Sequence, residues 1–135
     1  SMDYLNESDP TPRVERLYLS AEKKNLDQAS QHFREYYEKI ESFIQLHISE
    51  PITRQAISES IHISPDYISH IVRSIAECSC KELITHEKMK HARHLIENTS
   101  QPIGNIAAAC GYDSFAYFSK VYKATYGVSP RRDRK

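Results

Sequence analysis

The sequence has little glycine, few cysteines and no long hydrophobic run, and each shortage excludes a class of protein. Only three glycines occur in 135 residues, and alternating apolar and polar runs are rare, so strands are not indicated. Three cysteines cannot all pair with one another. Cys78 and Cys80 are also too close in sequence for an easy disulfide, which argues against a secreted disulfide framework. The longest apolar run, Ile106 to Cys110, is far too short to cross a bilayer.

What is present fits one soluble globular domain in a reducing cytoplasm. The chain is 39% hydrophobic and 27% charged, which is too apolar for a disordered segment. Its length suits one domain with a tail. Residues 1–10 have neither the basic flank nor the apolar core of a signal peptide or a membrane anchor. We therefore expect a cytoplasmic protein with no membrane association.

The formal net charge is zero, but the charges are unevenly distributed along the chain. Residues 1–30 and 31–100 each carry a net charge of −2, whereas residues 101–135 carry six basic side chains against two acidic ones. A basic end of this kind predicts contact with a polyanion. A solvated basic tail would have the same composition.

Apolar residues recur at helical spacing along most of the chain, which predicts an all-α fold. Residues 1–30 are weakly patterned, so we expect a linker there with a short helix near 14–26. One face of the next helix, which ends before Pro51, carries Tyr36, Ile40, Phe43, Ile44 and His47. Thr53, Ser64 and Ser114 are the expected N-caps of helices over 54–60, 64–76 and 114–126. Gly111 and Gly127 are expected to end the helices over 103–110 and 114–126. A further amphipathic helix is predicted over 81–98, because apolar residues gather on one side of it: Ile84, Met89, Ala92, Leu95 and Ile96.

A repeat of about 50 residues organises the second half of the chain. Ile57-Ser58, His62 and 67–73 in the first copy correspond to Ile106-Ala107, Gly111 and 117–123 in the second. Each copy predicts a short helix, a turn and a longer helix, with a small residue that lets the two helices cross closely. This is a helix-turn-helix, whose second helix can present its solvent face to a DNA major groove.

The second copy carries a longer motif, Ile103-x-x-Ile106-Ala107-x-x-x-Gly111-Tyr112-Asp113-Ser114-x-x-Tyr117-Phe118-Ser119-Lys120-x-Tyr122-Lys123-x-x-x-Gly127-x-Ser129-Pro130. This motif resembles the signature of the AraC/XylS family of bacterial transcription regulators, and the resemblance runs from about Glu35 to Arg132. It implies about seven helices in two helix-turn-helix subdomains, with a first unit over 31–79, a long linker helix over 80–99 and a second unit over 100–135. It also implies that each unit reads one major-groove segment of double-stranded DNA, with RNA polymerase recruited nearby.

The resemblance places DNA-facing residues on the second helix of each unit. In the first unit they are Asp66, Ser69, His70 and Arg73, and in the second they are Phe115, Ala116, Ser119, Lys120 and Lys123. Lys120 is expected to donate to guanine, and Phe115 and Ala116 to touch a thymine methyl. Ser119 can contact a base or a phosphate, while Arg73 and Lys123 are expected to hold phosphates.

The chain departs from the family pattern at a few positions. The family often has glycine at Glu77, aromatic residues at Cys80 and near Asp133, and arginine at Lys88. The changes at Glu77 and Asp133 bear on the geometry of one turn and of the tail, rather than on the fold. In addition, 54–76 carries two basic and two acidic side chains, so the first unit is electrostatically weak.

Enzymatic interpretations have little support. His86-Glu87-x-x-Lys90-His91 is similar to a zinc-protease helix, but its second histidine comes five residues after the first and lies on another face. His91, His94, Cys78 and Cys80 lack the paired spacing of metal ligands. Neither a glycine-rich phosphate loop nor a nucleophile elbow occurs. We therefore expect no catalysis, no metal and no cofactor.

Two alternatives concern binding. Tyr112, Tyr117, Phe118 and Tyr122 have helical spacing, which predicts core packing rather than a stacking platform for single strands. A helical protein-interaction module that uses the face of Tyr36, Ile40, Phe43 and Ile44 is the alternative to DNA binding. About 30 N-terminal residues are too few to fold a sensing domain. We therefore expect that an effector-binding or dimerisation domain is missing from this chain. The chain is then either a fragment of a longer regulator or a compact single-domain member of the family.

Overall fold

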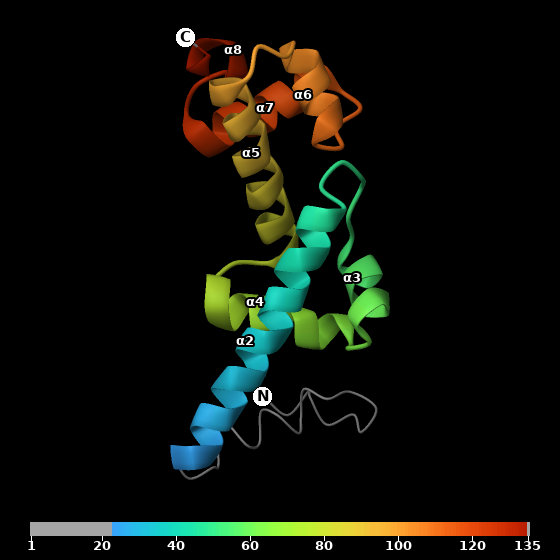
Figure 1. Ribbon diagram of the computed structural model, residues 1–135, viewed down its shortest axis with the longest axis vertical. Helices are drawn as coiled ribbons and strands as arrows, with labels where there is room; N and C mark the ends of the chain where they lie inside the picture. The colour runs from blue at the N-terminus through green and yellow to red at the C-terminus, as the bar shows by residue number, and fades with distance from the viewer. Residues whose placement is uncertain (1–22, 135) are drawn as a thin grey trace. The chain divides into compact units, whose positions relative to one another are not determined.

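The computed structural model describes residues 23–134, and these residues form seven α-helices and no strand. The predicted all-α fold with about seven helices is confirmed. No helix in this range is both long and apolar enough to cross a membrane. In chain order the helices are α2 (Lys23–Leu46), α3 (Arg54–Ile61), α4 (Pro65–Ala76), α5 (Cys80–Asn98), α6 (Ile103–Ala109), α7 (Phe115–Tyr126) and α8 (Pro130–Asp133) (Figure 1).

Helix α2 begins earlier than the sequence pattern indicates. It starts at Lys23, seven residues before residue 30, where the predicted linker ends. No glycine or proline lies between Lys23 and Leu46, so nothing interrupts the helix once its packed turns have nucleated it. Most of the short helix predicted near 14–26 falls outside the described residues.

Three helices, α3, α4 and α7, begin at the predicted caps. The side-chain oxygens of Thr53, Ser64 and Ser114 each accept a hydrogen bond from the backbone N–H three residues further on, at 3.0 to 3.1 Å. Ser129 caps α8 in the same way. At the start of α5, Ser79 and Glu82 form a reciprocal capping box, in which each side chain accepts from the other residue's backbone N–H.

Four residues close the helix ends in the left-handed region. Gly111 (φ +82°) and Gly127 (φ +80°) do so in the second repeat copy, as predicted. At the matching places in the first copy, His62 (φ +61°) and Glu77 (φ +58°) adopt the same conformation. The turn after α4 therefore keeps its geometry although Glu77 stands where the family often has glycine.

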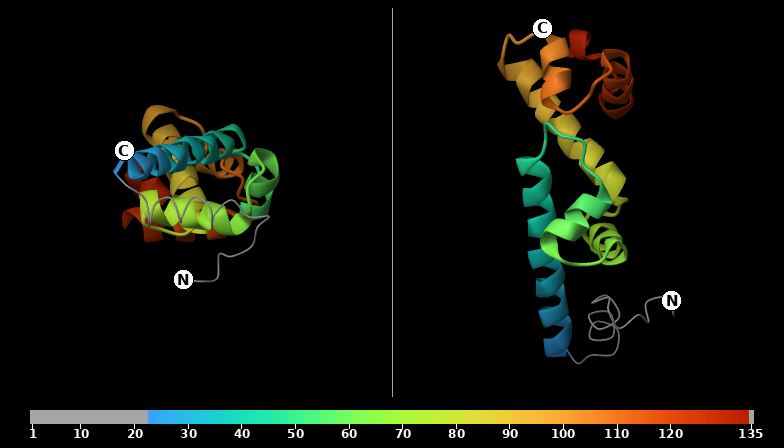
Figure 2. Two further views of the ribbon diagram at one scale, coloured as in Figure 1. Left: turned by 90° about the horizontal axis from the view of Figure 1, so that it is seen from below. Right: turned by 90° about the vertical axis from the view of Figure 1, so that its right-hand side faces the viewer.

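Residue contacts divide the chain into two compact units. Among the described residues, the first unit contains 23–43 and 53–83, and the second contains 44–52 and 84–134. The boundary between the two units falls within α5, between Leu83 and Ile84. Within the first unit α3 packs against α4, and within the second α6 packs against α7 and α7 against α8 (Figures 1 and 2).

Each unit has its own apolar core. In the first unit the buried side chains come mainly from α2, α3 and α4: Phe33, Ile40, Ile57, Ile63, Tyr67, Ile68, Ile71 and Val72. In the second unit they come from α5, α6 and α7: Met89, Ala92, Ile96, Ile106, Ala107, Cys110, Phe118 and Tyr122. Burial of each large side chain stabilises the fold by roughly 1.5–3 kcal/mol. Ile40 and Ile44 are fully buried, and Tyr36 and Phe43 are half-buried. Most of the apolar face of α2 is therefore used in packing and is not a free surface for an interaction module.

Candidate nucleic-acid interface

The first helix-turn-helix consists of α3 and α4, and a small buried residue lets the two helices approach closely. Ser58 is 7% exposed, and its hydroxyl donates a 2.5 Å hydrogen bond to the Ile63 carbonyl in the turn. Ala107 takes the corresponding place in the second unit and is 2% exposed. Both observations agree with the close crossing expected from the sequence repeat.

The solvent side of α4 carries the residues predicted to face DNA. Asp66, Ser69, His70 and Arg73 are spaced so that they share one side of the helix, while Tyr67, Ile68, Ile71 and Val72 are buried. Asp66 and Arg73 are exposed, whereas Ser69 and His70 are half-buried.

Two of these residues are engaged within the protein, which the sequence does not indicate. The His70 ring packs edge-on against Phe33 of α2, with 5.4 Å between ring centroids. The Ser69 hydroxyl oxygen accepts a 2.7 Å hydrogen bond from Nη1 of Arg54, the first residue of α3. Arg54 was absent from the predicted set, since the sequence motif places DNA contacts on second helices only.

In the second unit, α7 presents a more accessible and more basic face. Phe115 is 46% exposed, and Ala116, Lys120 and Lys123 are also exposed, while Ser119 is half-buried. Phe118 and Tyr122 are fully buried, as predicted. The prediction that Tyr117 packs in the core is wrong, because this side chain is 56% exposed and only tilts against Tyr112 at 6.0 Å. The corresponding residue of α4, Tyr67, is fully buried because Phe33 and Tyr36 of α2 pack against its ring.

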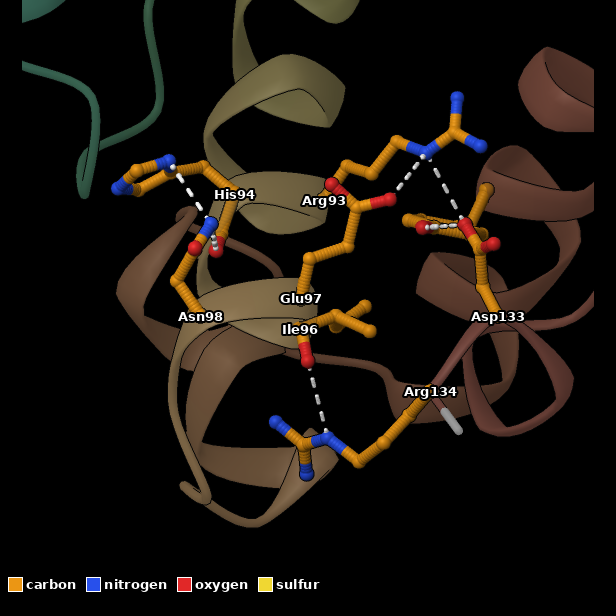
Figure 3. Close-up of polar contacts among 8 residues, drawn as sticks. Arg93, His94, Ile96, Glu97, Asn98, Asp133 and Arg134 are labelled. Atoms are coloured by element: carbon orange, nitrogen blue, oxygen red, sulfur yellow. Dashed lines mark hydrogen bonds and ion pairs between the residues drawn. The ribbon is translucent and has the colours of Figure 1, made fainter.

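A polar cluster fixes α7 to α5 and α8. The Tyr122 hydroxyl donates a hydrogen bond to Asp133, and the Arg93 Nε lies 3.2 Å from the same carboxylate and 3.4 Å from that of Glu97 (Figure 3). The Arg93 guanidinium also lies 4.3 Å from the centre of the Tyr126 ring, a cation–π contact. Burial and the Asp133 hydrogen bond both raise the pKa of Tyr122, so its hydroxyl stays protonated as a donor. Asp133 thus joins α5, α7 and α8. The family often has an aromatic residue near this position.

The basic tail divides into residues with different roles. Arg134 donates to the main-chain oxygen of Ile96 in the last turn of α5 (Figure 3). It also donates to the main-chain oxygens of Thr99 and Gln101, which follow that helix. Arg131 and Arg132 are exposed. Of the arginines counted in the tail, these two remain available to a polyanion, whereas Lys135 lies outside the described residues.

The cysteines and histidines do not gather into a metal site in the part of the chain that the structure describes. No group of three or more His, Cys, Asp or Glu side chains suited to a metal ion occurs among residues 31–134, whose side chains the structure describes. Cys78, Cys80 and Cys110 are free thiols. Burial raises the pKa of Cys80 and of Cys110 to about 11, so both are protonated thiols at neutral pH.

The paired units and their exposed second helices define a helix-turn-helix domain, and comparison with known proteins agrees. A family model described as "Helix-turn-helix domain" matches residues 57–135. The HTH-type transcriptional regulator YisR of Bacillus subtilis, itself described as uncharacterized, is 27% identical over 139 residues, which cover 99% of this chain and 48% of YisR. The chain belongs to the AraC/XylS family of helix-turn-helix transcription regulators.

Two solved structures show the same fold. The C-terminal domain of AraT, a response regulator from Geobacillus stearothermophilus, has a TM-score of 0.69 and 33% identity over 73% of this chain and 83% of its own. The DNA-binding domain of AdpA, solved with a target DNA, has a TM-score of 0.67 and 17% identity over 73% of this chain and 88% of its own. The chain spans about a quarter to a half of the length of the curated relatives it matches.

Proposed function

We propose that the chain binds double-stranded DNA as a monomer and places α4 and α7 in two major-groove segments about one helical turn apart. The observation that supports this proposal is the occurrence of two helix-turn-helix units with the same construction within one chain. In both copies a serine caps an exposed second helix, and a left-handed residue closes the first. A recognition helix held in this way enters a major groove with one face.

The exposed face of α7 supports the base contacts of the second unit. Lys120 donates to guanine, while Phe115 and Ala116 contact a thymine methyl group. Ser119 serves a base or a phosphate, and Lys123 with the exposed Arg131 and Arg132 contacts phosphates.

On α4, the four residues predicted from the sequence have unequal access. Arg73 is exposed and contacts a phosphate. Asp66 is also exposed, and its carboxylate is repelled by the negatively charged DNA phosphates. Ser69 and His70 are half-buried, and they orient α4 as much as they contact DNA. The first unit therefore contributes discrimination or a contact with RNA polymerase more than affinity.

The whole protein acts, on this proposal, as a cytoplasmic regulator that works with RNA polymerase. The chain spans only part of the length of its relatives, which supports a further effector-binding or dimerisation domain outside it. The domain itself catalyses no reaction and folds without metal or cofactor. A chelator should therefore leave its helical circular dichroism and its melting temperature unchanged.

Binding-site selection from random duplexes, followed by footprinting of the selected site, tests the proposal. We expect salt-dependent binding and two protected stretches on one DNA face, with centres about 10 base pairs apart. Sedimentation of the complex should show one chain per site. A single short footprint, or binding that requires two chains, would contradict the two-helix mode.

A further inference from the structure

We propose that Arg54 contacts a DNA backbone phosphate beside the α4 segment, with Ser69 holding its guanidinium in place. The inference rests on the proposed function and extends it to a residue on the first helix of the helix-turn-helix. Neither the repeat nor the family motif assigns a role to Arg54.

The geometry begins with one hydrogen bond between two helices. Arg54 Nη1 donates to Ser69 Oγ at 2.7 Å, and thereby joins the first turn of α3 to the exposed side of α4. Ser69 lies on that side between Asp66 and Arg73. The Arg54 side chain is therefore held against the surface that enters the groove, although its own backbone belongs to the neighbouring helix.

The position of α3 favours a phosphate as the ligand. In a helix-turn-helix the second helix lies in the groove, while the first crosses the DNA backbone. A guanidinium has five N–H donors in a planar fork that fits a phosphate. The bond to Ser69 uses one donor, which leaves the others for phosphate oxygens. Because Ser69 only accepts in this bond, its own hydroxyl proton also remains available.

The charge balance of the first unit supports the same role. Over 54–76 the only basic residues are Arg54 and Arg73, against Glu59 and Asp66. Arg54 therefore supplies half of the positive charge of this helix-turn-helix. An arginine already held in one orientation also loses less side-chain entropy on binding than a mobile one.

The experiment measures fluorescence anisotropy of one selected duplex at several salt concentrations. The unchanged chain is compared with Arg54→Ala, Arg54→Lys and Ser69→Ala. The melting temperature of each variant is also measured. Arg34→Ala is the matched control, because Arg34 is an exposed arginine of the same unit on α2, outside the helix-turn-helix.

We expect Arg54→Ala to reduce the salt slope of log K by about one, which corresponds to about tenfold weaker binding near 0.1 M salt. Arg54→Lys should keep the slope and bind a few-fold more weakly, since it keeps the charge and loses the fork. Ser69→Ala should keep the slope with a smaller loss of affinity. Arg34→Ala should match the unchanged chain.

Different outcomes overturn the inference and the function on which it rests. If the unchanged chain shows no salt-dependent duplex binding, the proposed function fails and the phosphate contact fails with it. If the unchanged chain binds DNA but Arg54→Ala keeps the same salt slope, the phosphate contact of Arg54 is excluded. The proposed function then still stands. If Arg54→Ala and Ser69→Ala lower the melting temperature equally and both keep the salt slope of DNA binding, the hydrogen bond between Arg54 and Ser69 has a purely structural role.

Discussion

Lys88 Nζ donates a 2.9 Å hydrogen bond to the main-chain oxygen of Cys110, at the end of α6. The same ammonium donates to the carbonyls of Ile48 and Glu50, each at 2.7 Å. Lys88 is only 7% exposed, and a buried charge is tolerated only where polar groups surround it. One side chain thus ties the segment after α2 to the turn of the second helix-turn-helix, within one unit.

Gly111, the residue after Cys110, should be the least replaceable glycine of the chain. Its φ of +82° disfavours any side chain, and a Cβ there would lie 2.8 Å from Lys88 Nζ and 3.1 Å from the Glu50 carbonyl oxygen. We expect Gly111→Ala to lower the free energy of unfolding by about 3 kcal/mol, from backbone strain and overpacking together. Urea denaturation monitored by circular dichroism measures the change.

The other two glycines are matched controls for these two effects. Gly127 has φ +80° but no atom within 4 Å of a built Cβ, so Gly127→Ala should cost about 1 kcal/mol from backbone strain alone. Gly104 lies inside α6 with open space around it, and Gly104→Ala should stabilise by about 0.5–1 kcal/mol. Equal losses at Gly111 and Gly127 would show that the contact with Lys88 carries no cost.

Glu77 should tolerate the reverse substitution. Its backbone is left-handed at φ +58°, which costs a side-chain-bearing residue roughly 1 kcal/mol that glycine does not incur. We expect Glu77→Gly to raise the melting temperature slightly, with Glu77→Ala unchanged as the control because alanine keeps the strain. A clear loss of stability in Glu77→Gly would indicate that the Glu77 side chain has a role of its own.

The capping box at the start of α5 should make stability depend on pH through Glu82. Hydrogen bonds from Ser79, first from its backbone N–H, hold the pKa of Glu82 below its usual value. The stabilisation is therefore fully present above a pH of about 5 and is lost as pH falls through the folded-state pKa. The stability difference between the unchanged chain and Glu82→Gln should shrink steadily in urea titrations from pH 6 to pH 3. A difference that stays constant over this range would contradict the role of the carboxylate.

Local patterns in the sequence were sufficient to predict the helices and most of the core. Thr53, Ser64 and Ser114 cap where expected because an N-cap depends on the next three residues alone. Gly111 and Gly127 adopt the left-handed conformation for a similarly local reason. The start of α2 was missed because it depends on the absence of a break rather than on a signal.

Contacts between distant residues could not be predicted in the same way. The bond from Arg54 to Ser69 joins residues 15 apart, and Arg134 reaches carbonyls more than 30 residues earlier. A count of charges in the sequence does not distinguish an arginine that donates to main-chain carbonyls from one whose guanidinium is exposed to solvent. The partial burial of His70 against Phe33 likewise depends on how α2 and α4 pack.

Arg134 and Arg131 should therefore have separable effects although they lie three residues apart. Arg134→Ala removes three hydrogen bonds to the last turn of α5 and the residues that follow it, and should lower the free energy of unfolding by about 1–3 kcal/mol. Arg131→Ala should leave stability unchanged and reduce the salt slope of DNA binding by about one. Thermal melting and anisotropy on the same preparations check both. If both variants lost stability equally, Arg131 would not be the free cation that its exposure indicates.

The last prediction concerns the relative contribution of the two units to affinity. Lys120 and Lys123 are exposed on α7, whereas His70 and Ser69 are half-buried and engaged within the first unit. Lys120→Ala and Lys123→Ala should each weaken binding by about 1–3 kcal/mol. His70→Ala and Ser69→Ala should cost less. Asp66→Asn should strengthen binding at low salt, because it removes a carboxylate that phosphates repel.

Fluorescence anisotropy on one selected duplex, repeated at several salt concentrations, ranks these variants. Lys81→Ala is the control for loss of one positive charge, since Lys81 is exposed on α5 outside both helix-turn-helix segments. Melting each variant separates lost contacts from lost folding, which matters most for His70, whose ring packs on Phe33. If a fully folded His70→Ala abolished binding while Lys120→Ala left it intact, α4 would be the principal reader, and the greater basicity of α7 would not determine affinity.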